Sequence, residues 1–310
     1  IPHAVEELNR AAAVTRVGYL TNNASRTAAI VADQLRSFGL NSTVDDVVTS
    51  PQAAVKLLAQ TVPPGQTVLV VGGDGLVDEL TKAGYRVTRS ADDDPAAVVQ
   101  GFAPHVGWEH LAEAAFALAE RPGRDLLPWI ATNTDWTLPL ERGLAPGNGT
   151  LVSAVHAAVA RLPEFAGKPE TPIYEQAFSR FGTSNALMIG DRLDTDIQGA
   201  NAAGISSLHV LTGVDRPKQL IAAGANMRPD YIVASLKELH EPYPVTETLS
   251  DGTAKVGSAQ VRMDGHIVNI VKHGDSPLNL LRAGCAAVWA SGLAIYALVV
   301  PEEIYEDHWS

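Results

Sequence analysis

The sequence has one cysteine and comparatively few basic side chains. Because Cys285 has no second cysteine to pair with, no intramolecular disulfide can form, and we expect a small apolar core residue in a reducing cytoplasm. Lysine and arginine total 23 against 35 acidic residues, which gives a formal net charge of −12. This charge repels nucleic acid and anionic membranes, so we expect neither as a partner.

A long uninterrupted apolar run is also lacking. Residues 283–300 carry no charge and approach the length of a membrane-spanning helix, but Ser291-Gly292 divides them. The pattern therefore favours a helix followed by a buried strand over residues 293–300. No signal-peptide pattern opens the sequence, and we expect a cytoplasmic protein.

Apolar strand patterns alternate with helical patterns through most of the chain, which predicts an α/β fold with a largely parallel sheet. The length of 310 residues suits two or three domains. The strands that we expect cover residues 16–20, 68–71, 97–100, 129–133, 186–190, 205–211 and 231–233. We expect helices over residues 108–120, 150–160 and 235–240, and an irregular loop from the end of the strand at 129–133 through Gly149.

The pattern of alternating strands and helices changes after Pro242 and Pro244. Residues 259–263 and 266–271 predict a hairpin across a strong turn dipeptide, Asp264-Gly265. Ser276-Pro277 then suits the N-cap and first position of a helix. These patterns predict a small α+β appendage over residues 246–310.

One apolar strand ends on an aspartate, in the segment Met188-Ile189-Gly190-Asp191. A strand delivers such a side chain to the carboxyl edge of the sheet, where α/β proteins bind their ligands. A carboxylate there suits a hard cation such as Mg²⁺, and Asp196 at the start of the next helix can orient it. The plainer alternative is that Asp194 and Asp196 only cap that helix.

Two further segments suit a phosphoryl group. Thr21-Asn22-Asn23 follows a strand and offers a hydroxyl and successive backbone N–H groups, although Thr and Asn are also ordinary N-cap residues. Gly167-Lys168-Pro169 fixes a lysine that can neutralise phosphate charge, although a lone loop lysine is usually just solvated.

In this order and spacing, the three segments resemble motifs two, three and four of the haloacid dehalogenase superfamily. The long interval between Thr21 and Lys168 resembles the type IIA branch, which has a large α/β cap of the C2 type. That branch includes p-nitrophenylphosphatases and phosphoglycolate, glycerol 3-phosphate and pyridoxal phosphatases, and the sequence looks most like the actinobacterial glycerol 3-phosphate phosphatases. The supporting phrases are Asp46–Ser50, Gly101-Phe102, Ala131–Asp135 and Pro146–Gly149.

The resemblance implies a Rossmann-like core with an inserted cap. The core would comprise residues 1–63 and 163–241 without its first strand, and the cap would be residues 64–162. The implied activity is Mg²⁺-dependent hydrolysis of a small phosphomonoester, of the glycerol 3-phosphate or 2-phosphoglycolate type, through a phosphoaspartate. A homodimer formed through the cap is also expected from the resemblance.

The resemblance assigns roles to matching positions. Thr21, Asn22 and Asn23 would hold the phosphoryl group, and Lys168 would balance its charge. Asp191 would bind Mg²⁺ directly, with Asp196 in support. The cap loop would select the substrate through Asp135, Trp136, Thr137 and Arg142.

The sequence departs from the family pattern at the first motif, Asp-x-Asp-Gly, whose first Asp attacks phosphorus. In this branch an Ile-Pro pair usually follows that motif, and here Ile1-Pro2 is the first dipeptide. Asp74 cannot substitute, because it follows motif two and falls within the cap. We therefore expect the nucleophile to lie in a missing N-terminal segment, and the chain as written to be inactive.

Other interpretations compete. Gly72-Gly73-Asp74-Gly75 resembles a loop of NAD and diacylglycerol kinases, but Leu76 stands where those have Thr. A non-catalytic sensor of a phosphorylated ligand would keep the phosphate pocket without the nucleophile. The appendage is either an acetyltransferase-like fragment or, more simply, a packing or dimerisation element.

Overall fold

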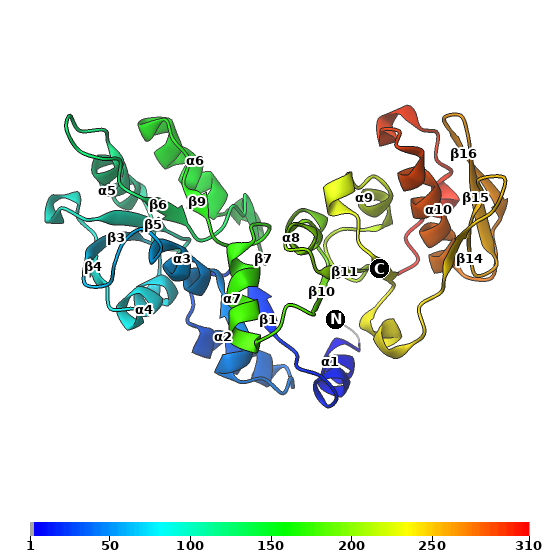
Figure 1. The fold of residues 1–310 in the computed structure, drawn as a ribbon, viewed down its shortest axis with the longest axis horizontal. Helices are drawn as coiled ribbons and strands as arrows, with labels where there is room; N and C mark the ends of the chain where they lie inside the picture. The colour runs from blue at the N-terminus through cyan, green and yellow to red at the C-terminus, as the bar shows by residue number, and fades with distance from the viewer. Residues whose placement is uncertain (1–2, 310) are drawn as a thin grey trace. The chain divides into compact units, whose positions relative to one another are not determined.

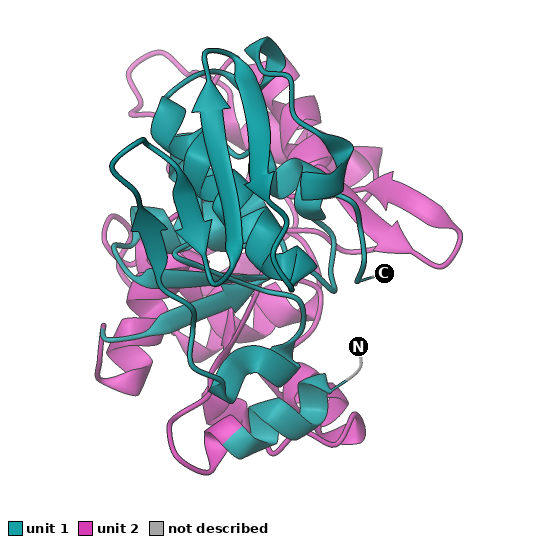
Figure 2. Ribbon diagram, turned by 90° about the vertical axis from the view of Figure 1, so that its right-hand side faces the viewer, with its two compact units in different colours: residues 1–10, 185–310 teal, residues 11–184 magenta. Residues whose placement is uncertain are grey.

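The computed structural model describes residues 3–309, so the Ile1-Pro2 pair lies outside the described residues. The chain divides into two compact units, residues 1–10 with 185–310 and residues 11–184 (Figure 2). Each unit groups the residues that contact one another more than they contact the rest of the chain. The core, cap and appendage boundaries expected from the sequence stay predictions.

A five-stranded parallel sheet, in the order β4-β3-β5-β6-β9, is the largest element of the unit of residues 11–184 (Figure 1). Its strands are β3 (Thr67–Val71), β4 (Arg86–Thr88), β5 (Ala97–Gln100), β6 (Trp129–Ala131) and β9 (Glu164–Phe165). The register aligns Leu69 with Val98 and Val98 with Trp129, so alternate apolar side chains share one face. The predicted strands at 68–71, 97–100 and 129–133 are confirmed.

Helices cover both faces of this sheet (Figure 1). Buried residues of α5 (Trp108–Leu118) and α6 (Asn148–Val159) pack with Leu69 and Val98 in one apolar cluster. The opposite face is covered by α3 (Ser50–Leu58) and α4 (Asp74–Lys82). Each fully buried aliphatic side chain contributes roughly 1.5–3 kcal/mol, so the sheet has a substantial core of its own.

A second, two-stranded parallel sheet lies in the same unit. Its elements are β1 (Tyr19–Thr21) and β2 (Val47–Thr49), with α2 (Ala28–Ser37) and α7 (Pro172–Phe181) packed on β2. Ala28 and Ala32 of α2 bury against Val47. Among residues 3–309, β1 pairs with β2 alone and its side chains are only half-buried, so one edge of β1 has no strand beside it.

The loop expected after β6 contains a hairpin instead. β7 (Thr137–Leu140) and β8 (Gly143–Pro146) pair antiparallel, with Thr137 opposite Pro146. The prediction of an irregular loop through Gly149 was therefore wrong. The hairpin was not predicted because proline and glycine are depleted in strands except at edges, and this segment contains Pro139, Gly143 and Pro146.

The unit of residues 1–10 and 185–310 holds a three-stranded parallel sheet, in the order β10-β11-β12. Its elements are β10 (Leu187–Gly190), β11 (Ser206–Val210) and β12 (Tyr231–Val233), with α8 (Gln198–Ala202), α9 (Pro217–Ile221) and 3₁₀ helices at Ala225–Met227 and Leu236–His240. The predicted strands at 186–190, 205–211 and 231–233 are confirmed. Within the described residues β10 pairs with β11 alone, and Leu187 of this apolar strand is 42% exposed.

A four-stranded antiparallel sheet and a long helix form the C-terminal part of this unit (Figure 1). The strands are β13 (Thr246–Thr248), β14 (Ala254–Val256), β15 (Ala259–Asp264) and β16 (Ile267–Lys272), and the helix is α10 (Pro277–Ser291). The Asp264-Gly265 turn between β15 and β16 and the Ser276 cap of α10 are as predicted. The two short strands β13 and β14 were not predicted.

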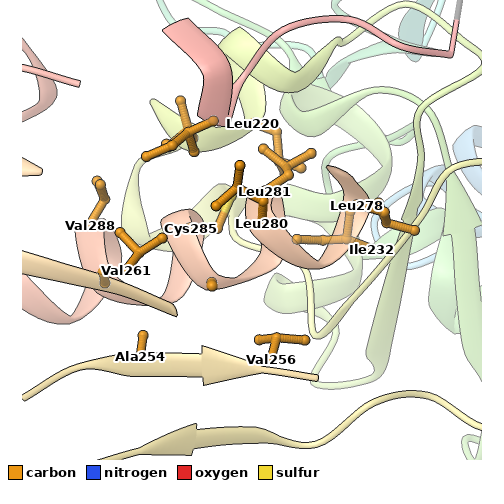
Figure 3. Close-up of a cluster of buried hydrophobic side chains, with 14 of the residues drawn as sticks. Leu220, Ile232, Ala254, Val256, Val261, Leu278, Leu280, Leu281, Cys285 and Val288 are labelled. Carbon is orange, nitrogen blue, oxygen red and sulfur yellow. The ribbon is translucent and has the colours of Figure 1, made fainter. Parts of the chain in front are cut away.

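An apolar cluster joins α10 to this sheet (Figure 3). Leu281 and Cys285 of α10 are fully buried with Val256 and Val261 of the strands. Arg282 adds a polar link, because its Nε and Nη2 donate to the Ile232 carbonyl of β12 at 2.9 and 2.6 Å. An α+β element after β12 is present as expected, and its bounds at 246–310 stay a prediction.

The predicted buried strand at residues 293–300 was wrong. Gly292 adopts a left-handed φ of 67° and ends α10, after which residues 295–297 form a 3₁₀ turn. Only Val299 makes a ladder contact, with Ile267, and Tyr296 is 92% exposed. No helix in the described part of the chain is long and apolar enough to cross a membrane.

Candidate active site

Thr21 ends β1 and begins the polar loop expected to hold phosphate. Its Oγ1 accepts a hydrogen bond from the Asn23 N–H at 3.1 Å. Asn23 Oδ1 in turn accepts from Ser25 N and Oγ and from Arg26 N. These contacts fix a tight turn, and accepting at Oγ1 leaves the Thr21 hydroxyl hydrogen available to donate to an anion.

Asn22 joins this loop to Lys168. Its Oδ1 accepts from the Lys168 N–H at 2.9 Å, and its Nδ2 donates to the Lys168 carbonyl at 2.9 Å and to Asp135 Oδ1 at 3.0 Å. The side chain therefore holds the Gly-Lys-Pro segment against the strand end. The predicted role of Asn22 in holding the phosphoryl group stays a prediction.

Lys168 lies beside the end of β1. Its Nζ donates to the Leu20 carbonyl at 3.3 Å, one residue before Thr21. Gly167 is needed for this approach, because an added Cβ would lie 2.4 Å from the Thr132 carbonyl oxygen and 2.6 Å from Asn22 Oδ1. The structure thus brings Thr21, Asn22, Lys168 and Asp135 into one cluster within residues 11–184.

Buried amides that the sequence did not single out support this cluster. Asn133 Nδ2 donates to the Asn22 carbonyl at 2.7 Å, and Ser50 Oγ donates to the same oxygen at 2.9 Å. Asn148 Nδ2 donates to the Asn133 carbonyl at 2.9 Å. Both Asn133 and Asn148 are almost fully buried, where a polar side chain needs partners. In the sequence, they were marked only by lying in two segments that resemble the family, Ala131–Asp135 and Pro146–Gly149.

The remaining cap-loop residues lie outside this cluster. Trp136 stands at the base of the β7–β8 hairpin and is 65% exposed, with Thr137 next to it, also exposed. Arg142 lies in the turn at the tip, beyond four-residue strands that extend about 13 Å. Their substrate-binding roles, and a dimer formed through the cap, stay predictions.

On the other unit, β10 delivers Asp191 to the edge of its sheet as predicted. Asp191 Oδ2 accepts from the Val214 N–H at 2.8 Å, and the Asp191 carbonyl accepts from Asp215 N at 3.0 Å. Val214 and Asp215 belong to the loop after β11. This loop therefore orients the Asp191 carboxylate through one of its oxygens.

Asp196 supports the same turn from the chain that follows. Its Oδ2 accepts from the N–H groups of Asp191 and Arg192, both at 3.2 Å. A π-helical turn at residues 193–197 carries Asp196 back over these donors, and such turns are frequent at functional sites. Gly190 is required, because a Cβ there would lie 2.2 Å from the Asp196 Cβ. A capping carboxylate also makes such a contact with the N–H of an N-cap residue, here Arg192, so the capping alternative stays open beside the metal-site role.

The donor set at Asp191 fits Mg²⁺. Among residues 3–309, no hydrogen bond or ion pair engages its second oxygen, Oδ1, and no cluster of three or more acidic, histidine or cysteine side chains is placed to enclose a metal. Mg²⁺ usually keeps several waters and binds through one or two carboxylates together with substrate phosphate. A single well-oriented carboxylate suits that pattern and not a Zn²⁺ or Ca²⁺ cage.

His209 packs behind this loop. It is fully buried on β11, and burial lowers the pKa of its imidazole below the usual value, so the ring is neutral at pH 7. Its Nε2 lies 3.0 Å from the Asp215 carbonyl oxygen, to which a neutral ring protonated at Nε2 donates. Sequence reasoning missed His209, because nothing around it in the chain marks it.

The Gly72–Gly75 turn does not form a phosphate cradle. A Cβ at Gly75 would lie 2.4 Å from the Arg26 carbonyl oxygen, and one at Gly73 would lie 3.1 Å from the Ser25 carbonyl oxygen. Gly75 N also faces the Ser25 carbonyl at 3.4 Å. Close packing on residues 25–26 explains these glycines, which removes the basis of the kinase hypothesis.

Family models and known proteins agree with this geometry. Residues 1–86 match a model described as haloacid dehalogenase-like hydrolase, and residues 165–239 match a model described as HAD-hydrolase-like. D-glycerol 3-phosphate phosphatase of Mycobacterium tuberculosis is 42% identical over 284 residues, covering 89% of this chain and 78% of the relative. The chain is a haloacid dehalogenase-like hydrolase.

Solved structures place this hydrolase among capped phosphatases. The magnesium complex of glycerol phosphate phosphatase from Mycobacterium tuberculosis superposes with a TM-score of 0.86 at 38% identity, covering 100% of this chain and 92% of that one. The p-nitrophenyl phosphatase from Archaeoglobus fulgidus gives 0.68 at 29% identity, covering 77% and 91%. The hydrolase thus has the capped α/β fold that the sequence predicted, and it resembles a phosphatase of the expected branch.

Proposed function

We propose that this hydrolase is a Mg²⁺-dependent phosphatase of a small phosphomonoester, of the glycerol 3-phosphate or 2-phosphoglycolate type. The observation that carries the proposal is the fixed position of Lys168 against the end of β1, where Asn22 holds both its N–H and its carbonyl. A cation and a hydroxyl held at one strand end suit a phosphoryl dianion. The 42% identity to a D-glycerol 3-phosphate phosphatase supports the substrate class.

In the proposed reaction, Thr21 donates its hydroxyl hydrogen to a phosphoryl oxygen and Lys168 offsets the charge that develops on the transferring group. Asp191 would hold a Mg²⁺ ion, which would supply further positive charge to phosphoryl oxygens. Asp196 holds the Asp191 turn in place through the two backbone N–H groups.

The attacking group is a carboxylate that forms a bond to phosphorus while the bond to the alcohol oxygen breaks. A second carboxylic acid, placed with the first, gives its proton to the departing alcohol oxygen. Water then hydrolyses the acyl phosphate, which returns a proton to that second group and restores the attacking carboxylate. The first aspartate in the sequence, Asp33, lies in α2 and after Thr21. We place the attacking carboxylate in residues that precede Ile1 in the gene, and residues 1–310 alone would then not form the phosphoaspartate.

The test compares two proteins, residues 1–310 alone and the chain with whatever residues precede Ile1 in the gene. Phosphate release would be measured with Mg²⁺ on glycerol 3-phosphate, 2-phosphoglycolate, pyridoxal phosphate and p-nitrophenyl phosphate. We expect turnover by the longer protein only, with a preference for the first two substrates, and loss of turnover in Asp191→Ala. Turnover by residues 1–310 would disprove the proposed origin of the nucleophile.

A sensor of a phosphorylated ligand is the remaining outcome of the same experiment. A folded longer protein that hydrolyses none of the four compounds, but binds one of them in a way that depends on Lys168, would establish it. The carboxylate turn at Asp191 favours catalysis, because a simple anion sensor has no use for a cation site.

A further inference from the structure

The loop after β11, residues 213–216, makes contacts on both sides of the Asp191 turn. Val214 N donates to Asp191 Oδ2, and Asp215 Oδ2 accepts from Leu193 N at 2.7 Å. A Cβ at Gly213 would lie 2.1 Å from both the Cβ and Oδ2 of Asp191, so the two segments are in close contact. The position of this loop therefore sets the orientation of the Asp191 carboxylate.

Arg216 ends the loop and fixes it to two places in the same unit. Its Nη1 donates to the Leu211 carbonyl at 2.6 Å, at the end of β11. Its Nε and Nη2 lie 2.8 and 2.7 Å from Asp307 Oδ2, in the last residues of the appendage. Asp307 is itself held, because its Oδ1 accepts from Trp309 N at 3.1 Å.

The segment that carries Asp307 is anchored to the appendage. Ile304 is 1% exposed and belongs to the apolar cluster of α10, where it lies against Gly284. A hollow lies between this segment and Arg216, Pro217 and Lys218, so water reaches the ion pair. A continuous series of contacts thus runs from α10 through Asp307 and Arg216 to the loop at Asp191.

We propose that Asp307 is a positioning residue for the metal site, acting through Arg216 on the loop that orients Asp191. The proposal rests on the proposed function, because it assigns Mg²⁺ to Asp191. It gives the C-terminal appendage a part in catalysis, through the metal site and without contact with the substrate.

An ion pair can also serve only to fasten a chain end, and the two roles differ in what they change. The side chains of Arg216 and Asp307 are 26% and 32% exposed, and pairs that water reaches contribute little to overall stability. Fastening alone would therefore alter neither the Mg²⁺ affinity nor the Mg²⁺ concentration needed for activity. Positioning would alter both and leave the unfolding temperature nearly constant.

The test uses Asp307→Asn in the protein that includes any residues preceding Ile1. Glu247→Gln is the matched control, because Glu247 pairs with Lys255 at 3.1 Å in the same appendage and the same carboxylate-to-amide change is made. Mg²⁺ binding would be measured by calorimetry, and phosphate release would be followed against Mg²⁺ concentration. We expect roughly three- to tenfold weaker Mg²⁺ binding in Asp307→Asn and no change in the control. The expected loss is smaller than the roughly 10–100-fold loss typical of residues that hydrogen-bond directly to a metal-binding side chain, because Asp307 acts through Arg216.

A third variant tests the route through Arg216. Arg216→Lys keeps the charge but loses the forked contact, so it should weaken Mg²⁺ binding as well. Adding Asp307→Asn to Arg216→Lys should then cost little more, because the two residues act as one link. Additive losses would show that Asp307 acts by another route and would overturn the proposal.

The possible failures are distinguishable. Mg²⁺ binding and turnover by the unchanged protein, with equal Mg²⁺ affinity in Asp307→Asn, would disprove the positioning role and leave the phosphatase proposal intact. An unchanged protein that neither binds Mg²⁺ nor releases phosphate would overturn both proposals.

Discussion

The ends of β1 and β10 are two candidate binding sites built in different ways. At β1, neutral amides and a lysine converge from far apart in the chain, and Asn22 and Lys168 are 146 residues apart. At β10, carboxylates and backbone N–H groups meet over short intervals, with Asp191 and Asp196 five residues apart and Val214 23 residues from Asp191. The first set suits an anion and the second a cation.

The comparison teaches that the two sites depend on different parts of the fold. The amide cluster forms only when the β6 end and the Gly-Lys-Pro segment pack against the loop after β1, because Asn133 and Asn148 are partners in it. The carboxylate turn needs only β10, β11 and the loops that follow them. We therefore expect substitutions at the first site to alter folding and chemistry together, and those at the second to alter metal binding with less effect on folding.

The largest effect is expected for Lys168→Met, which keeps the length of the side chain and removes its charge. The transferring phosphoryl group loses its cation, so kcat/KM should fall by about 10²–10³-fold in the longer protein. Lys56→Met is the control, because Lys56 is an exposed lysine of the same unit whose Nζ contacts only a backbone oxygen, Glu175 O. Steady-state phosphate release checks both, and equal losses in the two variants would contradict the role of Lys168.

A smaller effect is expected for Gly213→Ala at the cation site. The new Cβ would meet the Asp191 carboxylate at 2.1 Å, and turning that carboxylate away should weaken Mg²⁺ binding by about 10–100-fold. Gly107→Ala is the control, because nothing lies within 4 Å of a Cβ there. Calorimetric titration with Mg²⁺ measures the change. An unaltered Mg²⁺ affinity in Gly213→Ala would show that Asp191 is not the ligand.

Asn22→Ala tests the dependence of the first site on packing. The change removes the Asn22 side chain from the N–H and carbonyl of Lys168. Each such group costs about 1–3 kcal/mol when it is buried and unsatisfied, and these two are partly buried. The free energy of unfolding should fall by roughly 2–3 kcal/mol, measured by denaturant titration. Asn226→Ala, at an exposed asparagine of the other unit, should stay within about 0.5 kcal/mol of the unchanged protein.

Sequence patterns predicted the strands that carry the sites because both are short apolar runs that end at polar residues, although the side chains of β1 are only half-buried and Leu187 of β10 is exposed. Lys168 and Asp191 were found because charged residues at strand ends match family motifs. Asn133, Asn148 and His209 were missed because a neutral buried side chain is defined by its partners, and these partners are remote in the sequence. The buried strand predicted at residues 293–300 was wrong for the converse reason. An apolar run predicts burial, but the fold leaves Tyr296 on the surface.

The domain boundaries illustrate a further limit of the sequence. A cap inserted into a core changes the course of the chain without changing its composition, so only family motifs suggested residues 64–162. The two compact units divide the chain at residue 184, in front of β10. Both β1 and β10 have one neighbouring strand among the described residues, and no pattern inside either strand reveals an unpaired edge.

The smallest effect is expected at Cys285, which reports on the appendage. Its thiol is fully buried in the α10 cluster (Figure 3), and burial raises the pKa of the thiol, so the reactive thiolate is scarce even in mildly basic solution. A thiol-specific chromogenic reagent at pH 8 should label none of the native protein within minutes and one equivalent per chain after denaturation. Labelling requires α10 to leave the β-sheet, so the slow rate at which Cys285 is labelled measures how often the appendage opens.

The same labelling rate sharpens the comparison of the two sites. If Asp307 acts on the metal site with little effect on folding, Asp307→Asn should label at nearly the rate of the unchanged protein while binding Mg²⁺ less tightly. Faster labelling in that variant would mean that the ion pair holds the appendage closed. The ion pair would then fasten the appendage as well as position the loop at Asp191, and the cation site would depend on packing as the anion site does.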